Sequence, residues 1–203
     1  MRHNRPRRKP RGLESRTVLL ISASSIALAA CAKVGEDVFN HESAPFDEPI
    51  RNWVLRHQDA AVRNSFLVIT GIAAPSVLIP TTLAAGAWLW RNRGLQIAGA
   101  VMMSPALSLA IFLGAKRIYK RKRPAGGARL HELTYAFPSG HSAASAAVLG
   151  TTAYVLWREG MIPRSAAALI GGAVPLLVGG SRVYLDVHWT TDVLGGLSVG
   201  ALV

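Results

Sequence analysis

The stretch SRVYLDVHWTTD, residues 181–192, places an arginine, two aspartates and a histidine between two apolar runs. The run before it contains AAALIGGAVPLLVGG, and the run after it reads VLGGLSVGALV. Charged groups beside hydrocarbon are costly, so they are usually functional or paired. This stretch therefore predicts a functional site at the edge of a membrane, and the remainder of the chain bears on that prediction.

The composition is both apolar and basic. Half of the 203 residues are hydrophobic and 17% are charged, yet the formal net charge is +12. Soluble proteins carry about 25% charged residues. These values are typical of a membrane protein that contacts anionic groups, with nucleic-acid binding as the competing interpretation. Because nucleic-acid modules do not usually carry several long apolar runs, we expect membrane lipids and no nucleic acid as partners.

The apolar segments predict an all-α fold, a polytopic membrane helix bundle with about six transmembrane helices. A span needs about 20 apolar residues, so the last segment, at 11 residues, is short, and the chain is either truncated or ends in a short helix. Pro75 and Pro80 are expected to kink the second span. The predicted helices occupy residues 17–34, 65–90, 95–115, 139–157, 165–180 and 193–203.

Two polar regions flank the first span. Residues 1–16 hold seven Lys or Arg and predict a disordered basic tail in the cytoplasm, followed by a membrane-embedded domain over 17–203. Residues 35–64 hold six acids and three arginines, with apolar residues at helical spacing. They predict a short amphipathic helix at the membrane surface.

The basic tail also predicts the orientation. If residues 1–16 stay in the cytoplasm, the loops 116–138 and 181–192 both emerge on the outer face, as in a bacterial inner-membrane protein. However, residues 116–129 also hold seven Lys or Arg. Either an anion site explains this outer basic loop, or the topology is inverted.

Cys31 is the one cysteine, so an intrachain disulfide is impossible. It ends the sequence LAAC after a basic start and an apolar run, which resembles a bacterial lipoprotein cleavage box. The alternative is a transmembrane helix rich in small residues with an incidental thiol, and small residues are common in such helices.

Three polar clusters are predicted to converge on the outer face, because two helices separate the loops that carry them. The first is Lys116 with Arg123, the second is PSGH at 138–141, and the third holds Arg182, His188 and Asp192. Arginine forks match phosphate oxygens, and lysine adds a point charge. The clusters therefore indicate a binding site for a tetrahedral anion.

The PSGH motif has the chemistry of a helix N-terminus. Ser139 is a favourable N-cap before an apolar helical run, and Gly140 leaves a backbone N–H with no side chain in the way. The N-terminus of a helix offers such N–H groups and a positive dipole end to an anion. His141 then lies in the first turn, near whatever binds there.

His188 and Asp192 are four residues apart, which places them on one face if a helix begins near His188. A carboxylate there accepts from one imidazole nitrogen, fixes the tautomer and leaves the other nitrogen as a nucleophile. His141 is then the candidate general acid. The arrangement predicts phosphoryl transfer without a metal or other cofactor.

The three motifs, K-x6-RP, PSGH and SR-x5-H-x3-D, resemble the signature motifs of the type 2 phosphatidic acid phosphatase superfamily, the lipid phosphate phosphatases. The resemblance implies a six-helix, metal-independent phosphatase that acts on a lipid phosphate or pyrophosphate. It implies that His188 forms a phosphohistidine, Asp192 orients it and His141 protonates the leaving oxygen. The residues implied to hold the phosphoryl group are Lys116, Arg123, Ser139, Gly140 and Arg182.

The sequence also admits rival interpretations of the three motifs. Vanadium haloperoxidases resemble the same motifs but are soluble, whereas this chain predicts several spans. A non-catalytic anionic-lipid-binding protein needs no relay of two histidines and an aspartate. A transporter would place charges at the bilayer midplane. The motifs select neither the lipid, for example phosphatidate, phosphatidylglycerol phosphate or undecaprenyl pyrophosphate, nor the oligomeric state.

Overall fold

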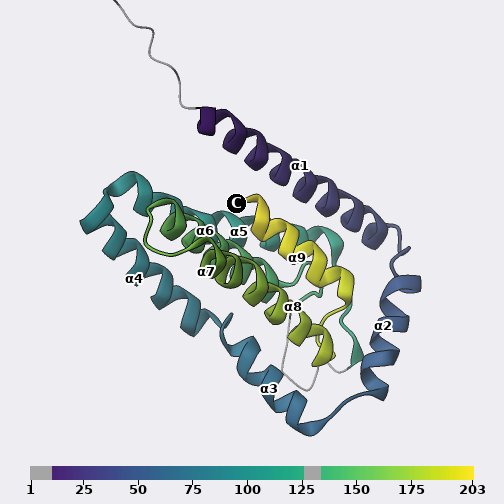
Figure 1. The fold of residues 1–203 in the computed structure, drawn as a ribbon. Helices are drawn as coiled ribbons and strands as arrows, with labels where there is room; N and C mark the ends of the chain where they lie inside the picture. Colours follow the sequence, from purple (N-terminus) through teal and green to yellow (C-terminus); the bar gives the residue numbers. More distant parts are fainter. Residues whose placement is uncertain (1–10, 126–133) are drawn as a thin grey trace, which may run out of the picture.

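The computed structural model of the chain describes residues 11–125 and 134–203. All long elements in these residues are helices (Figure 1). In chain order they are α1 (Arg11–Phe39), α2 (Ala44–Arg56), α3 (Ala60–Gly71), α4 (Pro75–Arg93), α5 (Leu95–Tyr119), α6 (Gly140–Arg158), α7 (Arg164–Ala168), the π-helical turn η2 (Leu169–Ala173), α8 (Val174–Tyr184) and α9 (Thr190–Leu202).

Helix α6 lies at the centre of the bundle and packs against α5, α8 and α9. Helix α4 packs on α5, and α1 runs along the outside against α9 (Figure 1). Helix α2 contacts both α8 and α9 near the loop that joins them. The C-terminal end of α5, the N-terminal end of α6 and the loop between α8 and α9 lie at the same end of the bundle. The three predicted motif clusters therefore meet there.

Each of the six predicted apolar segments is helical over most of its length, which confirms the fold class. In the described part of the chain, three helical stretches are long and apolar enough to cross a membrane: Ala60–Arg93, Leu95–Tyr119 and Arg164–Tyr184. The predicted amphipathic helix within 35–64 is α2. Residues 11–16 of the predicted tail are helical and belong to α1. Residues 1–10 lie outside the described residues, and the division of the chain at residue 16 stays a prediction.

The expected break in the second span lies just before Pro75. Helix α3 ends at Gly71 and α4 begins at Pro75, where the missing N–H costs no helical hydrogen bond. Pro80 lies inside α4, which continues through it. Residues 72–74 therefore separate two helices that together form one candidate span.

Glycines bring α9 very close to α6. A Cβ atom on Gly196 would lie 2.5 Å from the Ser139 carbonyl oxygen, and one on Gly200 would lie 2.5 Å from the Ala143 carbonyl oxygen. Helices in membranes commonly use small residues for such close approach. The contact places the start of α9, with Asp192, directly beside the start of α6.

Candidate active site

The cations of the first motif lie at the end of α5 and in the loop after it. Lys116, in the last turn of α5, is 7% exposed and donates to the carbonyl oxygen of Tyr135. Arg123 donates through Nε to the Thr134 carbonyl and through Nη1 to the Val187 carbonyl, each at 2.8 Å. Arg123 therefore joins the loop after α5 to the loop between α8 and α9.

The PSGH motif begins α6, as predicted. Ser139 is the fully buried N-cap, and its Oγ accepts from the N–H of Ser142 at 3.5 Å and from its hydroxyl at 3.0 Å. Gly140 is the first helical residue and His141 follows it in the first turn. The Ser139 N–H donates to the Asp192 carbonyl oxygen at 2.9 Å, so the starts of α6 and α9 are hydrogen-bonded to each other.

Arg182 lies in the last turn of α8 and is 2% exposed. Its Nη1 donates to the Thr70 hydroxyl at 3.0 Å. Its carbonyl oxygen accepts from the N–H groups of Val187 and His188 at 3.2 and 3.3 Å. Arg182 thus connects α3 to the loop that carries His188.

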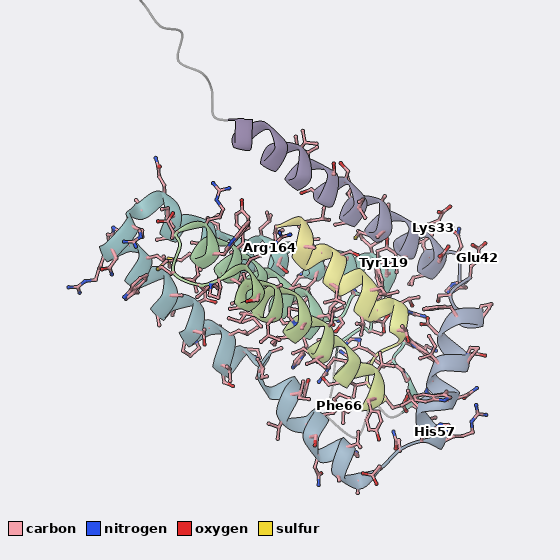
Figure 2. All side chains as sticks on the ribbon, in the orientation of Figure 1. Lys33, Glu42, His57, Phe66, Tyr119 and Arg164 are labelled. Carbon is pink, nitrogen blue, oxygen red and sulfur yellow. The ribbon has the colours of Figure 1, made fainter. Side chains whose placement is uncertain are left out.

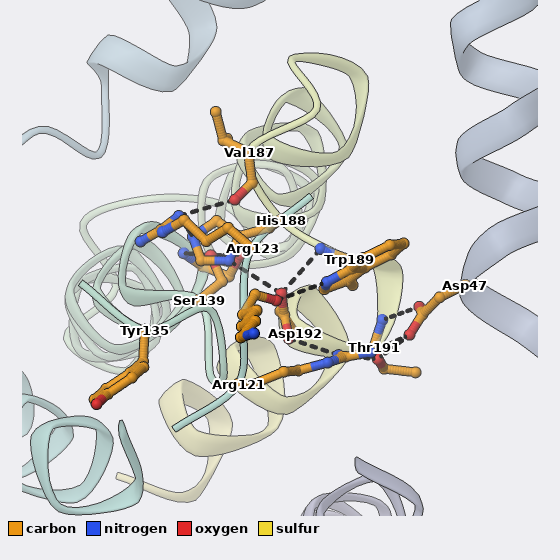
Figure 3. Close-up of polar contacts among 12 residues, drawn as sticks. Asp47, Arg121, Arg123, Tyr135, Ser139, Val187, His188, Trp189, Thr191 and Asp192 are labelled. Atoms are coloured by element: carbon orange, nitrogen blue, oxygen red, sulfur yellow. Dashed lines mark hydrogen bonds and ion pairs between the residues drawn. The ribbon is translucent and has the colours of Figure 1, made fainter. Parts of the chain in front are cut away.

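The hydrogen bonds of His188 define its tautomer (Figure 3). Nδ1 lies 3.3 Å from Asp192 Oδ2, and Nε2 lies 2.9 Å from Arg123 Nη1. A guanidinium nitrogen donates and cannot accept, so Nε2 must be the acceptor and Nδ1 must carry the proton. The neutral imidazole therefore points an unprotonated Nε2 at a cation of the first motif.

Burial lowers the pKa of His188 from its usual 6.5 to about 4. Asp192 opposes this change by stabilising the charged ring, whereas Arg123 and Arg182 lower the pKa further. The ring is 3% exposed, and removal from water disfavours its charged form. His188 is therefore neutral near pH 7, as a nucleophilic nitrogen requires.

One local expectation was wrong in detail. Helix α9 begins at Thr190, so His188 precedes it and the two residues do not share a helix face. They still meet because the Asp192 carboxylate, in the first turn, accepts from the Trp189 N–H at 2.9 Å and turns the preceding chain back. The aspartate therefore orients the loop as well as the ring.

Two functional candidates were missed by the sequence prediction: Asp47 and Arg121. Arg121 Nη1 lies 2.7 Å from Asp192 Oδ1, and Arg121 Nη2 lies 2.7 Å from Asp47 Oδ2 (Figure 3). Asp47 was one of six acids in a polar region, and Arg121 one of seven cations in a basic loop. No spacing rule separates either from its neighbours.

Asp186, to which the sequence assigned no role, also has a partner on α2. Its carboxylate accepts from Arg51 Nε at 2.6 Å and from Arg51 Nη2 at 3.0 Å. Asp186 has a φ of 57°, a conformation that aspartate tolerates better than most residues. The two-point ion pair holds this turn, two residues before His188.

A cavity of about 550 Å³ leads away from the site between α4, α5 and α6. Along α5 its lining runs from Met102 to Lys116, which at a rise of 1.5 Å per residue is about 21 Å. Apolar side chains line most of it, among them Leu78, Phe112 and Val148. The predicted residues that line it are Lys116, Arg123, Gly140, His141 and His188.

The other three predicted residues, Ser139, Arg182 and Asp192, are buried and do not line the cavity. Across the described residues, no three His, Cys, Asp or Glu side chains are grouped so that they could hold a metal ion. The site is thus an apolar cavity that ends at cations, histidines and the start of α6, a combination that can accommodate an anionic group on an apolar chain.

Comparison with known proteins identifies a family and a curated relative that resemble this chain. Residues 93–203 match the PAP2 superfamily. Phosphatidylglycerophosphatase B of Bacillus subtilis (strain 168) is 34% identical over 139 residues, which cover 66% of this chain and 68% of that protein. The family match over residues 93–203 contains all three motif clusters.

Two solved structures share the fold. The transmembrane PAP2 type phosphatidylglycerolphosphate phosphatase from Bacillus subtilis superposes with a TM-score of 0.74 at 29% identity, covering 90% of each chain. Aquifex aeolicus LpxE superposes with a TM-score of 0.58 at 16% identity, covering 76% of this chain and 90% of that one. The second likeness concerns the fold alone.

Proposed function

Because this chain belongs to the PAP2 superfamily and is an integral-membrane lipid phosphate hydrolase, we propose that it removes the terminal phosphate of a lipid phosphate or pyrophosphate through a phosphohistidine on His188. The tautomer of His188 carries this proposal. Its proton is on Nδ1, toward Asp192, and the Nε2 lone pair lies 2.9 Å from an Arg123 nitrogen. A phosphoryl oxygen bound to Arg123 would therefore bring phosphorus close to the nucleophilic nitrogen.

The reaction proceeds in two displacements. His188 Nε2 attacks phosphorus while the bond from phosphorus to the lipid oxygen breaks, and His141 protonates that oxygen. Water then attacks phosphorus with its proton passing to His141, the N–P bond breaks, and inorganic phosphate leaves. Asp192 holds the ring throughout and stabilises its positive charge, as the aspartate of a catalytic triad does.

The phosphoryl group is held by cations and by the start of α6. Lys116, Arg123 and Gly140 line the cavity. In the proposed mechanism the two cations and the N–H of Gly140 bind the oxygens of the phosphoryl group. Ser139 caps α6, and the Arg182 carbonyl oxygen accepts from the His188 N–H, so both residues support the groups around the phosphate. The charge of these groups also stabilises the transition state, in which charge is spread over the phosphoryl oxygens.

The apolar cavity supports a lipid substrate. Several lining side chains, including Ile79, Leu83 and Leu109, are about half exposed on the outside of the bundle, so an acyl or prenyl chain can reach the cavity from the bilayer. The curated relative and the first solved structure, both from Bacillus subtilis, are named for phosphatidylglycerophosphate, which makes this lipid the first candidate substrate. Phosphatidate and undecaprenyl pyrophosphate present the same terminal phosphate on an apolar anchor.

No divalent cation takes part in the proposed mechanism. Asp192, the carboxylate beside His188, already accepts from Arg121, His188 and the Trp189 N–H. Magnesium prefers an octahedral set of oxygen ligands, and a carboxylate so engaged is a poor ligand for it. We place the site on the extracytoplasmic face of a bacterial inner membrane, because the basic N-terminal residues are expected to stay inside.

The test is phosphate release by the purified full chain in detergent, over a panel of lipid phosphates with phosphatidylglycerophosphate included. Rapid quench with ³²P-labelled substrate should trap an acid-labile, alkali-stable phosphoenzyme, which His188→Ala should abolish together with turnover. Activity should persist in EDTA and be inhibited by orthovanadate. Turnover that requires added magnesium, or label that survives in His188→Ala, would refute the mechanism.

A further inference from the structure

Besides the Arg51–Asp186 ion pair, helix α2 contacts the active site through a buried carboxylate, Asp47. This residue is 1% exposed. Its Oδ1 accepts from the Thr191 N–H at 2.9 Å, and its Oδ2 accepts from the Thr191 hydroxyl at 2.6 Å and from Arg121 Nη2 at 2.7 Å. Thr191 is the residue before Asp192, so Asp47 holds the backbone and side chain adjacent to the catalytic carboxylate.

Arg121 completes the connection. Nη1 donates to the Thr191 hydroxyl and to Asp192 Oδ1, and Nη2 donates to the Ser43 hydroxyl and to Asp47 Oδ2, each at 2.7 Å. These four acceptors match the four N–H bonds of the two terminal nitrogens. Both are therefore fully used within the protein, which distinguishes Arg121 from a residue that binds phosphate.

The two buried carboxylates, Asp47 and Asp192, depend on the positive charge of Arg121. Asp47 and Asp192 both accept from Arg121, and both are essentially removed from solvent. Two such carboxylates would repel each other, and a buried charge without a partner is strongly destabilising. The guanidinium of Arg121 lies between them, its side chain 15% exposed, and neutralises the repulsion. It is also stacked near the Trp189 ring, with 5.5 Å between its carbon and the ring centroid.

We propose that Asp47 and Arg121 are positioning residues for the His188–Asp192 pair, so that α2 is part of the catalytic apparatus. Arg121 holds Oδ1 of Asp192 and thereby aims Oδ2 at His188 Nδ1, while Asp47 holds Arg121 and Thr191. The proposal rests on the proposed function, in which His188 attacks phosphorus. Neither residue touches the substrate, so both act on the rate of the chemical step rather than on substrate binding.

The experiment uses the full-length protein in detergent and three variants, Asp47→Asn, Arg121→Lys and Arg121→Met. Glu48→Gln removes the neighbouring acid of α2, and Lys122→Met removes a cation of the same loop; both are matched controls. We expect kcat to fall on the order of 10²-fold in Asp47→Asn and Arg121→Met, because a small misplacement of reacting groups costs about that much. KM should change less than about twofold, since uniform binding is not lost.

Arg121→Lys separates geometry from charge. Lysine keeps the positive charge but lacks the planar fork that serves four acceptors, so this variant should recover only part of the rate lost in Arg121→Met. If charge alone mattered, Arg121→Lys would equal the wild type, and the positioning proposal would be wrong.

A double-mutant cycle with Asp192→Asn tests whether the residues act through the aspartate. Residues in one hydrogen-bonded network give non-additive effects. In the Asp192→Asn background, Asp47→Asn should therefore cost less than about threefold in kcat. Equal costs in the two backgrounds would overturn the proposal, as would a raised KM at unchanged kcat.

Folding is monitored by size-exclusion profile and melting temperature. Asp47→Asn preserves the shape of the side chain, and a folded Asp47→Asn protein with wild-type kcat contradicts the proposal. If neither Asp47→Asn nor Arg121→Lys can be purified in monodisperse form, the pair is structural and the proposal also fails. The His188→Ala variant distinguishes failure of this proposal from failure of the proposed function. A fully active His188→Ala protein refutes the proposed function itself, whatever the Asp47 and Arg121 variants do.

Discussion

His188 is a neutral imidazole held in a place where a charged ring would be disfavoured. Burial and two nearby guanidiniums lower its pKa to about 4, although Asp192 favours the charged form. In the unfolded chain the ring regains its ordinary pKa of 6.5. Between these two values the unfolded state binds the proton and the folded state does not, so folding stability falls as pH decreases.

This linkage predicts a pH-dependent stability. Stability contributed by neutral His188 should be fully present above pH 6.5, decline as pH falls toward 4, and then level off. The total loss is at most about 3 kcal/mol, at 1.36 kcal/mol per pKa unit. The melting temperature of the wild type should thus fall more between pH 7 and pH 4 than that of His188→Gln. His57→Gln, which removes an exposed imidazole, is the control, and parallel curves for wild type and His188→Gln would refute the assignment.

At the scale of elements, the pairing of α9 with α6 determines the site. Gly196 faces the first turn of α6, where an added Cβ atom would meet the Ser139 oxygen at 2.5 Å, Ser142 Cβ at 2.9 Å and the Ala143 nitrogen at 3.2 Å. Two of these three neighbours are backbone atoms, which cannot rotate away. A side chain at Gly196 must therefore separate the helices that carry Asp192 and His141.

Gly196→Ala should consequently lower both stability and activity. Overpacking of this kind costs roughly 1–3 kcal/mol, and separation of the two helices should reduce kcat as well. Gly180→Ala in α8 is the matched control, because an added Cβ atom there has no neighbour within 4 Å. Melting temperature and phosphate release measured on both variants check this expectation. A Gly196→Ala protein as stable and active as Gly180→Ala would contradict the packing.

On the scale of the whole molecule, the two ends of the bundle carry different groups. The motif clusters, α2 and the α1–α2 turn lie at one end, and the α4–α5 turn with its arginines lies at the other. Glu42 and His57 are labelled at the motif end, on either side of α2 (Figure 2). Basic loops favour the cytoplasmic face, so the proposed orientation places the arginine-rich turn inside and the motif end outside.

Cysteine labelling tests this orientation. In a Cys31→Ser background, we expect Glu42→Cys, at the α1–α2 turn, to react with an impermeant maleimide in intact right-side-out spheroplasts. Asn92→Cys, at the α4–α5 turn, should react only after lysis. Both positions are exposed, so accessibility is matched. The reverse pattern would invert the topology and place the active site in the cytoplasm.

Much of this protein is determined by its sequence alone. Continuous apolar runs predict membrane helices because every backbone polar group in a bilayer must be satisfied within its own helix. Ser139 and Gly140 specify the start of α6 through local capping chemistry, and the three motif clusters emerge at one end by helix parity. The spacing of His188 and Asp192 also predicts their contact, which forms although α9 begins at Thr190 and His188 precedes the helix.

Only the tertiary structure decided what holds that contact. Asp47 and Arg121 are 74 residues apart and Asp47 and Thr191 are 144 apart, so no local spacing relates them. Their side chains resemble those of solvated acids and cations nearby until the packing of α2 against α8 and α9 excludes water from them. Burial makes their charges depend on one another, and burial is a property of how helices pack rather than of any contiguous stretch of sequence.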